Sequence, residues 1–291
     1  MTLAALLSIP SPSSPLIAEF GPLKIRWYGT LIAIGILIAG WIAERELQRR
    51  GYPPGRTYTI AMWCVPAGVI GARLYHVATD WDRFSGHLER IPLLQQGGLG
   101  LPGVILGGAI GAAIGARKAR IPVLEVFDVI APGLILAQAI GRWGNYFNQE
   151  LFGGPTNLPW GLEIDPAHRP AQYAADPTFH PTFLYESVWN LIVCLLLLQL
   201  SRRASSRLVP GTIFAAYLAL YSPVRALLES VRVDPAQMLF GVRFNQLLFS
   251  AVFVLSSIWF VLAWRRRRPP DAADATPPSA AEVPLGAEVD R

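Results

Sequence analysis

The sequence predicts an all-α polytopic membrane protein with about seven transmembrane helices. Of its 291 residues, 52% are hydrophobic and only 15% are charged, whereas soluble proteins usually carry about a quarter charged residues. The mean hydropathy is +0.37, and several apolar runs approach the roughly twenty residues that a helix needs to cross a bilayer. Basic residues gather beside these runs, as they do on the cytoplasmic side of membrane proteins.

The apolar runs place the expected helices along the chain. Within a membrane domain at 27–264, spans are expected at 27–43, 58–78, 97–116, 126–143, 182–200, 211–228 and 244–264. The third has glycine at every fourth position from 103 to 115, a pattern that lets membrane helices pack closely. Residues 145–181 are rich in Pro, Gly and Asp and predict an extracytoplasmic loop region. Residues 1–26 form an expected outer segment, and a basic stop with a disordered tail is expected at 265–291.

Four basic clusters predict the orientation. They follow the first, third, fifth and seventh spans, at 45–56, 117–120, 202–207 and 265–268. Odd-numbered spans end on the same side, so the positive-inside rule places the carboxyl terminus in the cytoplasm and the amino terminus outside. Because each cluster adjoins a span, a bilayer is the expected partner and nucleic acid is not. No metal-ligand spacing or disulfide framework is evident.

One polar stretch, GRWGNYFNQE at 141–150, follows an apolar run that contains no charge. Polar groups at membrane depth are costly and usually face a bundle interior or a cavity. The planar guanidinium of Arg142 suits a phosphate. Asn145, Asn148 and Glu150 follow it within one short segment, in which Glu150 could hold Arg142 in place. An arginine that snorkels to the lipid headgroups explains the same spacing equally well. The residues alone leave both interpretations open.

A second polar set lies on the sixth expected span. Tyr221, Arg225 and Glu229 are four residues apart and share one helix face, and Arg232 follows three residues later. This places another arginine in the same outer half of the membrane as Arg142, as a phosphate clamp requires. An internal Arg225–Glu229 ion pair that only locks the bundle is the alternative.

Further candidates stand at the outer ends of other spans. His180 could act as a base, because histidine is the side chain suited to proton transfer near neutral pH, or it could anchor a loop. Glu186 is expected to brace an arginine. Tyr28 fits an interfacial aromatic belt. Arg73 is either a snorkelling arginine or a second cation for a lipid phosphate. Tyr185 precedes Glu186 directly and completes the set.

Three of these segments together resemble the prolipoprotein diacylglyceryl transferase family. Residues 141–150 resemble its Gly-Arg-x-Gly-Asn-x-x-Asn-x-Glu signature, and HPTFLYE at 180–186 resembles its His-Pro-x-x-Leu-Tyr-Glu element. The spacing from Tyr221 to Arg232 resembles its late-helix motif, so the resemblance runs from about residue 27 to 246. Many members carry a histidine followed by glycine where this chain has GLGLPG at 98–103, around Pro102. This departure leaves the base that activates the thiol unassigned.

The resemblance implies a bacterial cytoplasmic-membrane enzyme without a cofactor or metal. It transfers the diacylglyceryl group of phosphatidylglycerol to the lipobox cysteine thiol of a preprolipoprotein, forming a thioether and releasing glycerol-1-phosphate. The expected catalytic residues are Arg142, Arg225, Tyr28 and His180. The expected substrate-binding residues are Asn145, Asn148, Glu150, Tyr221, Glu229, Arg232, Arg73, Tyr185 and Glu186. Two alternatives stay open: an anion transporter, which would more often show internal repeats and broken helices, and an inactive homologue that binds lipid.

Overall fold

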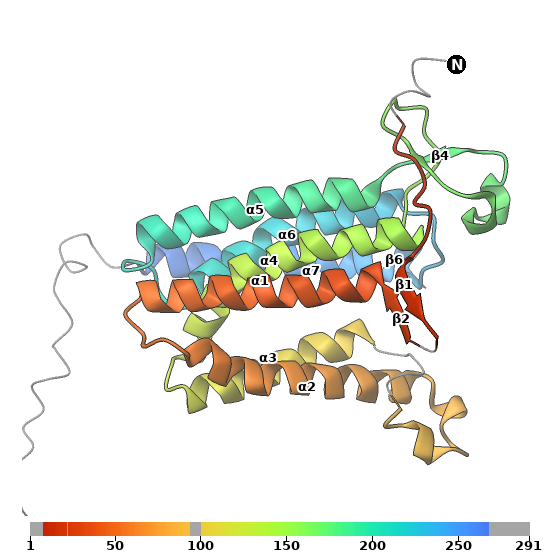
Figure 1. The fold of residues 1–291 in the computed structure, drawn as a ribbon. Helices are drawn as coiled ribbons and strands as arrows, with labels where there is room; N and C mark the ends of the chain where they lie inside the picture. The colour runs from red at the N-terminus through yellow and green to blue at the C-terminus, as the bar shows by residue number, and fades with distance from the viewer. Residues whose placement is uncertain (1–7, 22, 94–99, 268–291) are drawn as a thin grey trace, which may run out of the picture.

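The computed structural model describes residues 8–21, 23–93 and 100–267. In these ranges seven long helices run along a common direction and alternate in sense (Figure 1). They are α1 (Trp27–Arg49), α2 (Arg56–Thr79), α3 (Leu101–Lys118), α4 (Val123–Asn148), α5 (Thr182–Ala204), α6 (Thr212–Val231) and α7 (Phe244–Arg265). Five of them, α1, α2, α4, α5 and α7, are long and apolar enough to cross a membrane. The chain is an all-α polytopic membrane protein, as its composition predicts.

The expected spans coincide with the observed helices, with differences at some ends. The starts of α1, α5 and α7 are the predicted residues, whereas α1 continues past the expected end at residue 43 to Arg49. Its added turns remain helical because Glu46 is buried and bonded to Arg49 and Ser201. The expected start of the third span at 97, the tail from 268 onward and residues 1–7 lie outside the described residues.

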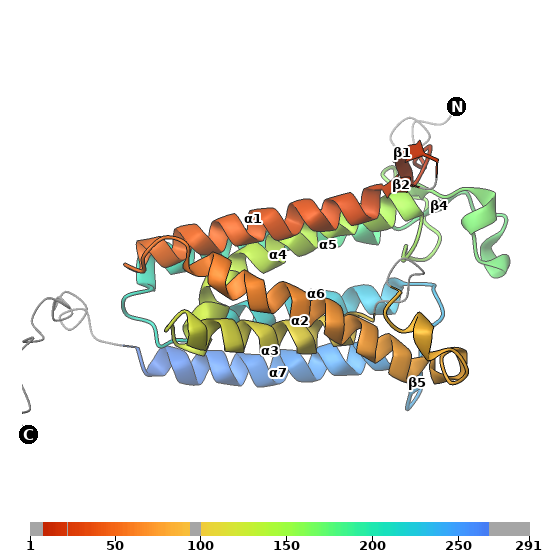
Figure 2. The same ribbon diagram turned by 60° about the horizontal axis from the view of Figure 1, so that its bottom comes forward.

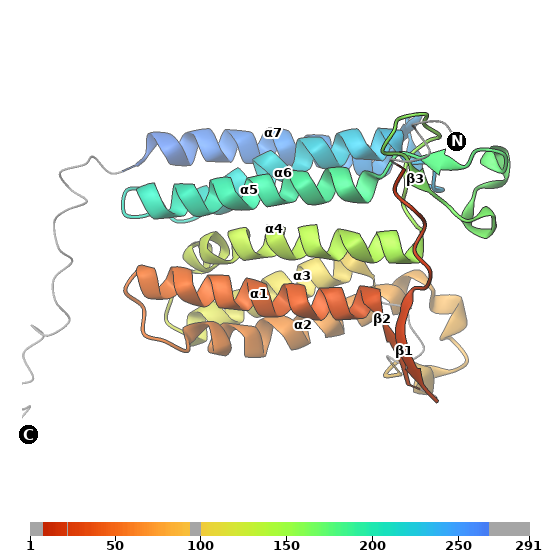
Figure 3. The ribbon, with the colours of Figure 1, turned by 45° about the horizontal axis from the view of Figure 1, so that its top comes forward.

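Helix α4 is the central helix of the bundle. It packs against α1, α3, α5 and α6, and Figure 3 shows it between the α5–α6 side and α1. Small residues allow the close approach of α1, because a Cβ on Gly133 would lie only 2.7 Å from the Cα of Ala39. This position brings the last turns of α4, which carry Arg142, next to several other helices.

Helices α2 and α3 pack side by side along their lengths (Figure 2). A Cβ on Gly103 would lie 2.1 Å from the carbonyl oxygen of Gly71, and one on Gly107 would lie 2.2 Å from that of Ala67. Such distances leave no room for a larger side chain, so the backbones touch. The close packing expected from the glycine repeat is confirmed.

The two ends of the bundle differ in character. The ends of α1, α3, α5 and α7, with their basic clusters, lie at one end (Figure 1). The opposite end carries three antiparallel two-stranded sheets. They pair β1 (Leu16–Phe20) with β2 (Leu23–Arg26), β3 (Leu162–Glu163) with β4 (Thr178–Phe179), and β5 (Met238–Leu239) with β6 (Val242–Arg243).

Residues 145–181 build a small cap at the end that carries the sheets. Two 3₁₀ helices, Pro166–His168 and Ala171–Tyr173, flank its strands, and its core contains Phe152, Leu162, Ile164, Phe179 and Phe183. The amino-terminal segment joins this cap, because the N–H of Ile9 donates to the carbonyl of Gly161 at 2.9 Å. The sequence predicted an extramembrane loop region here, but not its partnership with the amino-terminal segment.

Candidate active site

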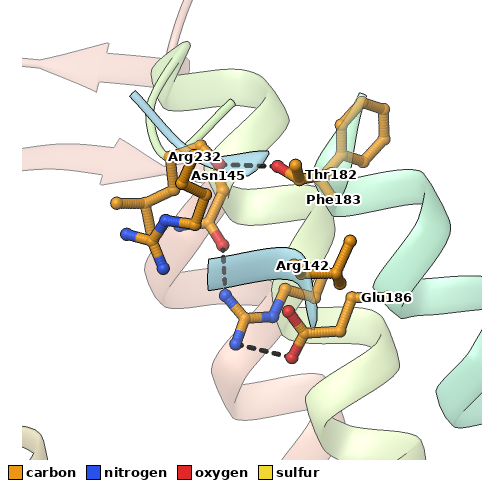
Figure 4. A pocket seen from close by; sticks show the side chains of 8 residues that line it. Arg142, Asn145, Thr182, Phe183, Glu186 and Arg232 are labelled. Atoms are coloured by element: carbon orange, nitrogen blue, oxygen red, sulfur yellow. Dashed lines mark hydrogen bonds and ion pairs between the residues drawn. The ribbon is translucent and has the colours of Figure 1, made fainter. Parts of the chain in front are cut away.

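Arg142 lies in a small pocket at the capped end of the bundle (Figure 4). Side chains from α4, α5, α6 and the segments that follow α4 and α6 meet there. The lining residues are Arg142, Asn145, Leu151, Thr182, Phe183, Glu186, Leu228 and Arg232. Two arginines from distant parts of the sequence therefore face one cavity.

The guanidinium of Arg142 is held inside the bundle by an ion pair. Its Nη2 lies 2.8 Å from Oε1 of Glu186, and its Nη1 donates to Oδ1 of Asn145 at 3.3 Å. The Tyr221 hydroxyl donates to the same Glu186 oxygen at 3.2 Å. The Glu186 side chain is only 5% exposed. Arg142 thus turns toward α5 and α6 instead of reaching along the helix to the headgroups, and Glu186 braces it as expected.

Glu150 has different partners from those the sequence suggested. Its Oε1 accepts hydrogen bonds from the amides of Asn145, at 2.8 Å, and Asn148, at 3.2 Å. It reaches Arg142 only through Asn145. The cause is the backbone: Gln149 ends α4 with a φ of 52°, and the N–H of Glu150 then folds back onto the Asn145 carbonyl at 3.0 Å.

Tyr28 packs from the first turn of α1 against the α4 turn that follows Arg142. A Cβ on Gly144 would lie 2.3 Å from Cδ2 of the Tyr28 ring. Next to it, Trp27 stacks on Phe147 with ring centroids 4.5 Å apart. Glycine at position 144 therefore permits the contact that places Tyr28 beside the pocket-forming turn.

The polar set on α6 forms a second network. Nη1 of Arg225 lies 2.6 Å from Oε2 of Glu229, and Nη1 of Arg232 lies 3.3 Å from the same oxygen. The Glu229 side chain is 1% exposed, and the Arg225 guanidinium stacks over the ring of Phe249 at 5.4 Å. The ion pair that the sequence offered as an alternative is present. It also adjoins the pocket, because Arg232 lines it.

Comparisons with known proteins agree with this geometry. The family model described as "Prolipoprotein diacylglyceryl transferase" matches residues 15–263. A Frankia alni protein named phosphatidylglycerol--prolipoprotein diacylglyceryl transferase is 45% identical over 272 residues, or 91% of this chain and 70% of the relative. A relative of the same name from Mycobacteroides abscessus is 42% identical, and the match covers 96% of this chain and 85% of the relative. Another from Trichormus variabilis is 41% identical, and the match covers 94% of this chain and 98% of the relative.

The chain belongs to the prolipoprotein diacylglyceryl transferase family. In this diacylglyceryl transferase family member, all three recognised motifs line the pocket, through Arg142, Glu186 and Arg232. The matched range also includes both networks and the first hairpin, β1–β2. The resemblance read from short motifs therefore extends over most of the fold.

Sequence reasoning missed the residues that complete the second network in this family member. Asp234 pairs with Arg232 through two contacts, at 2.7 and 2.9 Å. Arg243 reaches Glu229 and Asp234, with distances of 3.3 and 3.2 Å. Two signals were available. One is the Arg-x-Asp spacing at 232–234, and the other is an arginine directly before the last apolar span, at the end away from the basic clusters.

Three predicted site residues, His180, Tyr185 and Arg73, make the contacts described here away from the pocket. Nδ1 of His180 lies 3.2 Å from the Tyr185 hydroxyl, which also accepts a hydrogen bond from Trp160 at 3.1 Å. Arg73 donates to the carbonyls of Ile91 and Arg90 at 2.6 and 2.7 Å, within the α2–α3 connection. His180 and Tyr185 thus belong to the cap and Arg73 holds a loop. Their catalytic and substrate roles stay predictions.

Proposed function

We propose that this chain transfers the diacylglyceryl group of phosphatidylglycerol to the thiol of a lipobox cysteine in a preprolipoprotein. The names of its relatives state the reaction and both substrates. The family resemblance implies that the acceptor is the lipobox cysteine. In the transfer, the bond between the diacylglyceryl carbon and the phosphate oxygen breaks, and a carbon–sulfur bond forms. Glycerol-1-phosphate leaves, and the thiol gives up its proton.

The observation that supports this function best is the charge around the pocket. Among the described residues, the ion pairs of the pocket and the adjoining α6 network join four arginines to three carboxylates, which leaves a surplus of one positive charge. The arginines are Arg142, Arg225, Arg232 and Arg243, and the carboxylates are Glu186, Glu229 and Asp234. Exposed Glu150 contacts amides instead. An uncompensated buried charge is costly, and the single negative charge of a phosphodiester would neutralise it.

The orientation of Arg142 supports a role in the chemical step. Negative charge grows on the leaving phosphate as the carbon–oxygen bond breaks, so a cation fixed in advance stabilises the transition state more than the substrate. Glu186 and Asn145 fix this guanidinium through two of its nitrogens. Asn148 and Tyr28, beside the same turn, are our candidates for orienting the headgroup glycerol and the reacting groups.

We infer that the pocket faces the outer side of a bacterial cytoplasmic membrane. The four basic clusters lie at the other end of the bundle, where the positive-inside rule places the cytoplasm. With all seven helices crossing the membrane, the amino terminus is then outside and the carboxyl terminus is in the cytoplasm. A lipid of the outer leaflet and the lipobox of a translocated precursor would meet at the pocket.

The test is transfer of labelled diacylglyceryl from phosphatidylglycerol to a lipobox-cysteine peptide by the purified protein in lipid. We expect a thioether product and glycerol phosphate in equal amounts. Arg142→Ala should lower the rate by on the order of a hundredfold or more, the scale for losing a donor to a developing anion. Arg202→Ala is the matched control, because Arg202 is exposed and lies in the last turn of α5, at the opposite end of the bundle.

The outcomes separate the alternatives. A folded wild-type protein that binds phosphatidylglycerol but forms no thioether is the inactive homologue. Near-normal turnover by Arg142→Ala, with Arg202→Ala also active, would remove Arg142 from the mechanism.

A further inference from the structure

Arg243 reaches the arginine cluster because of a tight hairpin. Strands β5 and β6 pair Leu239 with Val242 and Met238 with Arg243. The two residues between them, Phe240 and Gly241, have φ angles of 52° and 77°, the backbone of a two-residue hairpin whose twist matches its strands. This turn brings the chain back toward α6 and places Arg243 directly before α7.

The Arg243 side chain is fixed on several sides. Its Nη1 donates to the carbonyl of Arg232 and its Nη2 to that of Asp234, both at 2.6 Å. Its Nη2 also lies 3.2 Å from the Asp234 carboxylate. The side chain is only 13% exposed. A guanidinium tied to two backbone carbonyls cannot swing away without loosening the segment that carries Arg232.

The other side of Arg243 faces the carboxylate that organises the α6 network. Its Nε lies 3.3 Å from Oε1 of Glu229, and the Asn245 amide approaches the same oxygen at 3.4 Å. Oε2 of Glu229 faces Arg225 and Arg232, at 2.6 and 3.3 Å. The two oxygens thus have different partners. The Arg243 Nε forms no hydrogen bond, so its attraction for Oε1 is that of an ion pair, and this attraction opposes the pull of Arg225 and Arg232 on Oε2.

We propose that Arg243 is a positioning residue for the transfer reaction. It orients Glu229, and through Glu229 it keeps Arg232, which lines the pocket, in the geometry needed to meet a phosphate. Arg243 is not among the residues that line the pocket, so it acts through Glu229 and does not touch substrate. This inference rests on the proposed function, since the reaction provides its readout.

Action through Glu229 predicts a particular kinetic pattern. In Arg243→Gln, kcat should fall by about tenfold to a hundredfold, because displacing a catalytic group by about 1 Å costs up to that much. KM for phosphatidylglycerol should stay within about threefold, because the same residues line the pocket and the displaced cation acts mainly on the charge that develops in the transition state. In a Glu229→Gln background the same substitution should lower kcat by a smaller factor than it does alone, since the route through Glu229 is already broken.

The experiment measures kcat and KM for wild type, both single variants and the double variant in lipid vesicles containing phosphatidylglycerol. Thermal denaturation confirms folding, and Arg265→Gln at the far end of α7 is the matched control. If Arg243→Gln does not fold, Arg243→Lys, which keeps a cation and a donor, enters the same cycle under the same criteria.

Each outcome decides the matter. A non-additive loss confined to kcat supports the positioning role. Turnover by Arg243→Gln within twofold of wild type, a loss that multiplies fully with that of Glu229→Gln, or a loss carried by KM overturns it. An inactive wild type instead overturns the proposed function together with this inference, so the two failures are told apart by the first measurement.

Discussion

The two glycines that flank Arg142 allow a sharp test of the pocket geometry. Gly144→Ala adds a Cβ that would lie 2.3 Å from the Tyr28 ring, whereas a Cβ on Gly141 would meet nothing within 4 Å. Both positions are inside α4, so each substitution gains about 1 kcal/mol of helix propensity. That gain cancels when the two variants are compared, and the contact with Tyr28 is the remaining difference.

The size of the effect follows from the distance. Ordinary contact begins at 3.4 Å, so the Tyr28 ring must retreat by about 1.1 Å from its 2.3 Å approach to the new Cβ. Overpacking of this kind costs about 1–3 kcal/mol. A shift of about 1 Å in a catalytic group lowers rates by on the order of a hundredfold. We therefore expect Gly144→Ala to lose most of its turnover and to be less stable than Gly141→Ala, which should work like wild type.

The assay is diacylglyceryl transfer, with thermal denaturation in the same lipid. A combined variant makes the test more specific. In a Tyr28→Ala background, Gly144→Ala has no ring to displace and should cause little further loss of turnover. Normal turnover by Gly144→Ala, or equal impairment of Gly141→Ala, would refute the claim that this contact positions Tyr28.

Two further predictions concern charge. Arg142→Gln leaves Glu186 buried without its cation and should destabilise the protein by about 3–5 kcal/mol. Adding Glu186→Gln should restore most of the melting temperature but no activity, and a double variant that melts no higher than the single one contradicts this. Tyr52 lies in the α1–α2 connection. Its burial, and to a smaller extent its hydrogen bond to Glu125, raise its pKa from 10.0 to about 12. The folded state therefore keeps the hydroxyl proton longer than the unfolded state, and the stability this contributes is present below pH 10.0 and is lost as pH rises through 12. In Tyr52→Phe the melting temperature should depend less on pH between these two values. Identical plots of melting temperature against pH for the variant and the wild type would contradict the assignment.

The sequence located the helices because hydropathy changes sharply where several of them begin. Arg26, Pro181 and Arg243 stand directly before α1, α5 and α7, and those three starts were predicted correctly. The carboxyl-terminal ends of the helices were less visible. Helix α4 continues five residues past its expected end at Trp143, to Asn148, because backbone hydrogen bonding does not require apolar side chains.

The sequence predicted which residues meet at the pocket better than it predicted which of them form ion pairs. The motifs supplied Arg142, Glu186 and Arg232, and the structure brings them to one pocket. The sequence could not show that Glu186 and not Glu150 pairs with Arg142, because that depends on the left-handed turn at Gln149. Arg243 was missed because strands of two residues carry almost no periodicity to read.

The contacts of Arg142 also explain how one arginine can be both a structural and a substrate-binding group. With no phosphate bound, a buried guanidinium needs a charged partner, and Glu186 provides one at 2.8 Å. The neutral Asn145 oxygen, at 3.3 Å, is the longer contact. On the proposed function, a phosphate oxygen that replaced Asn145 would exchange a neutral acceptor for a charged one, and charge-assisted hydrogen bonds are roughly twice as strong. Glu186 would keep the orientation throughout, so binding and release of the phosphate need not cost the bundle its α4–α5 ion pair.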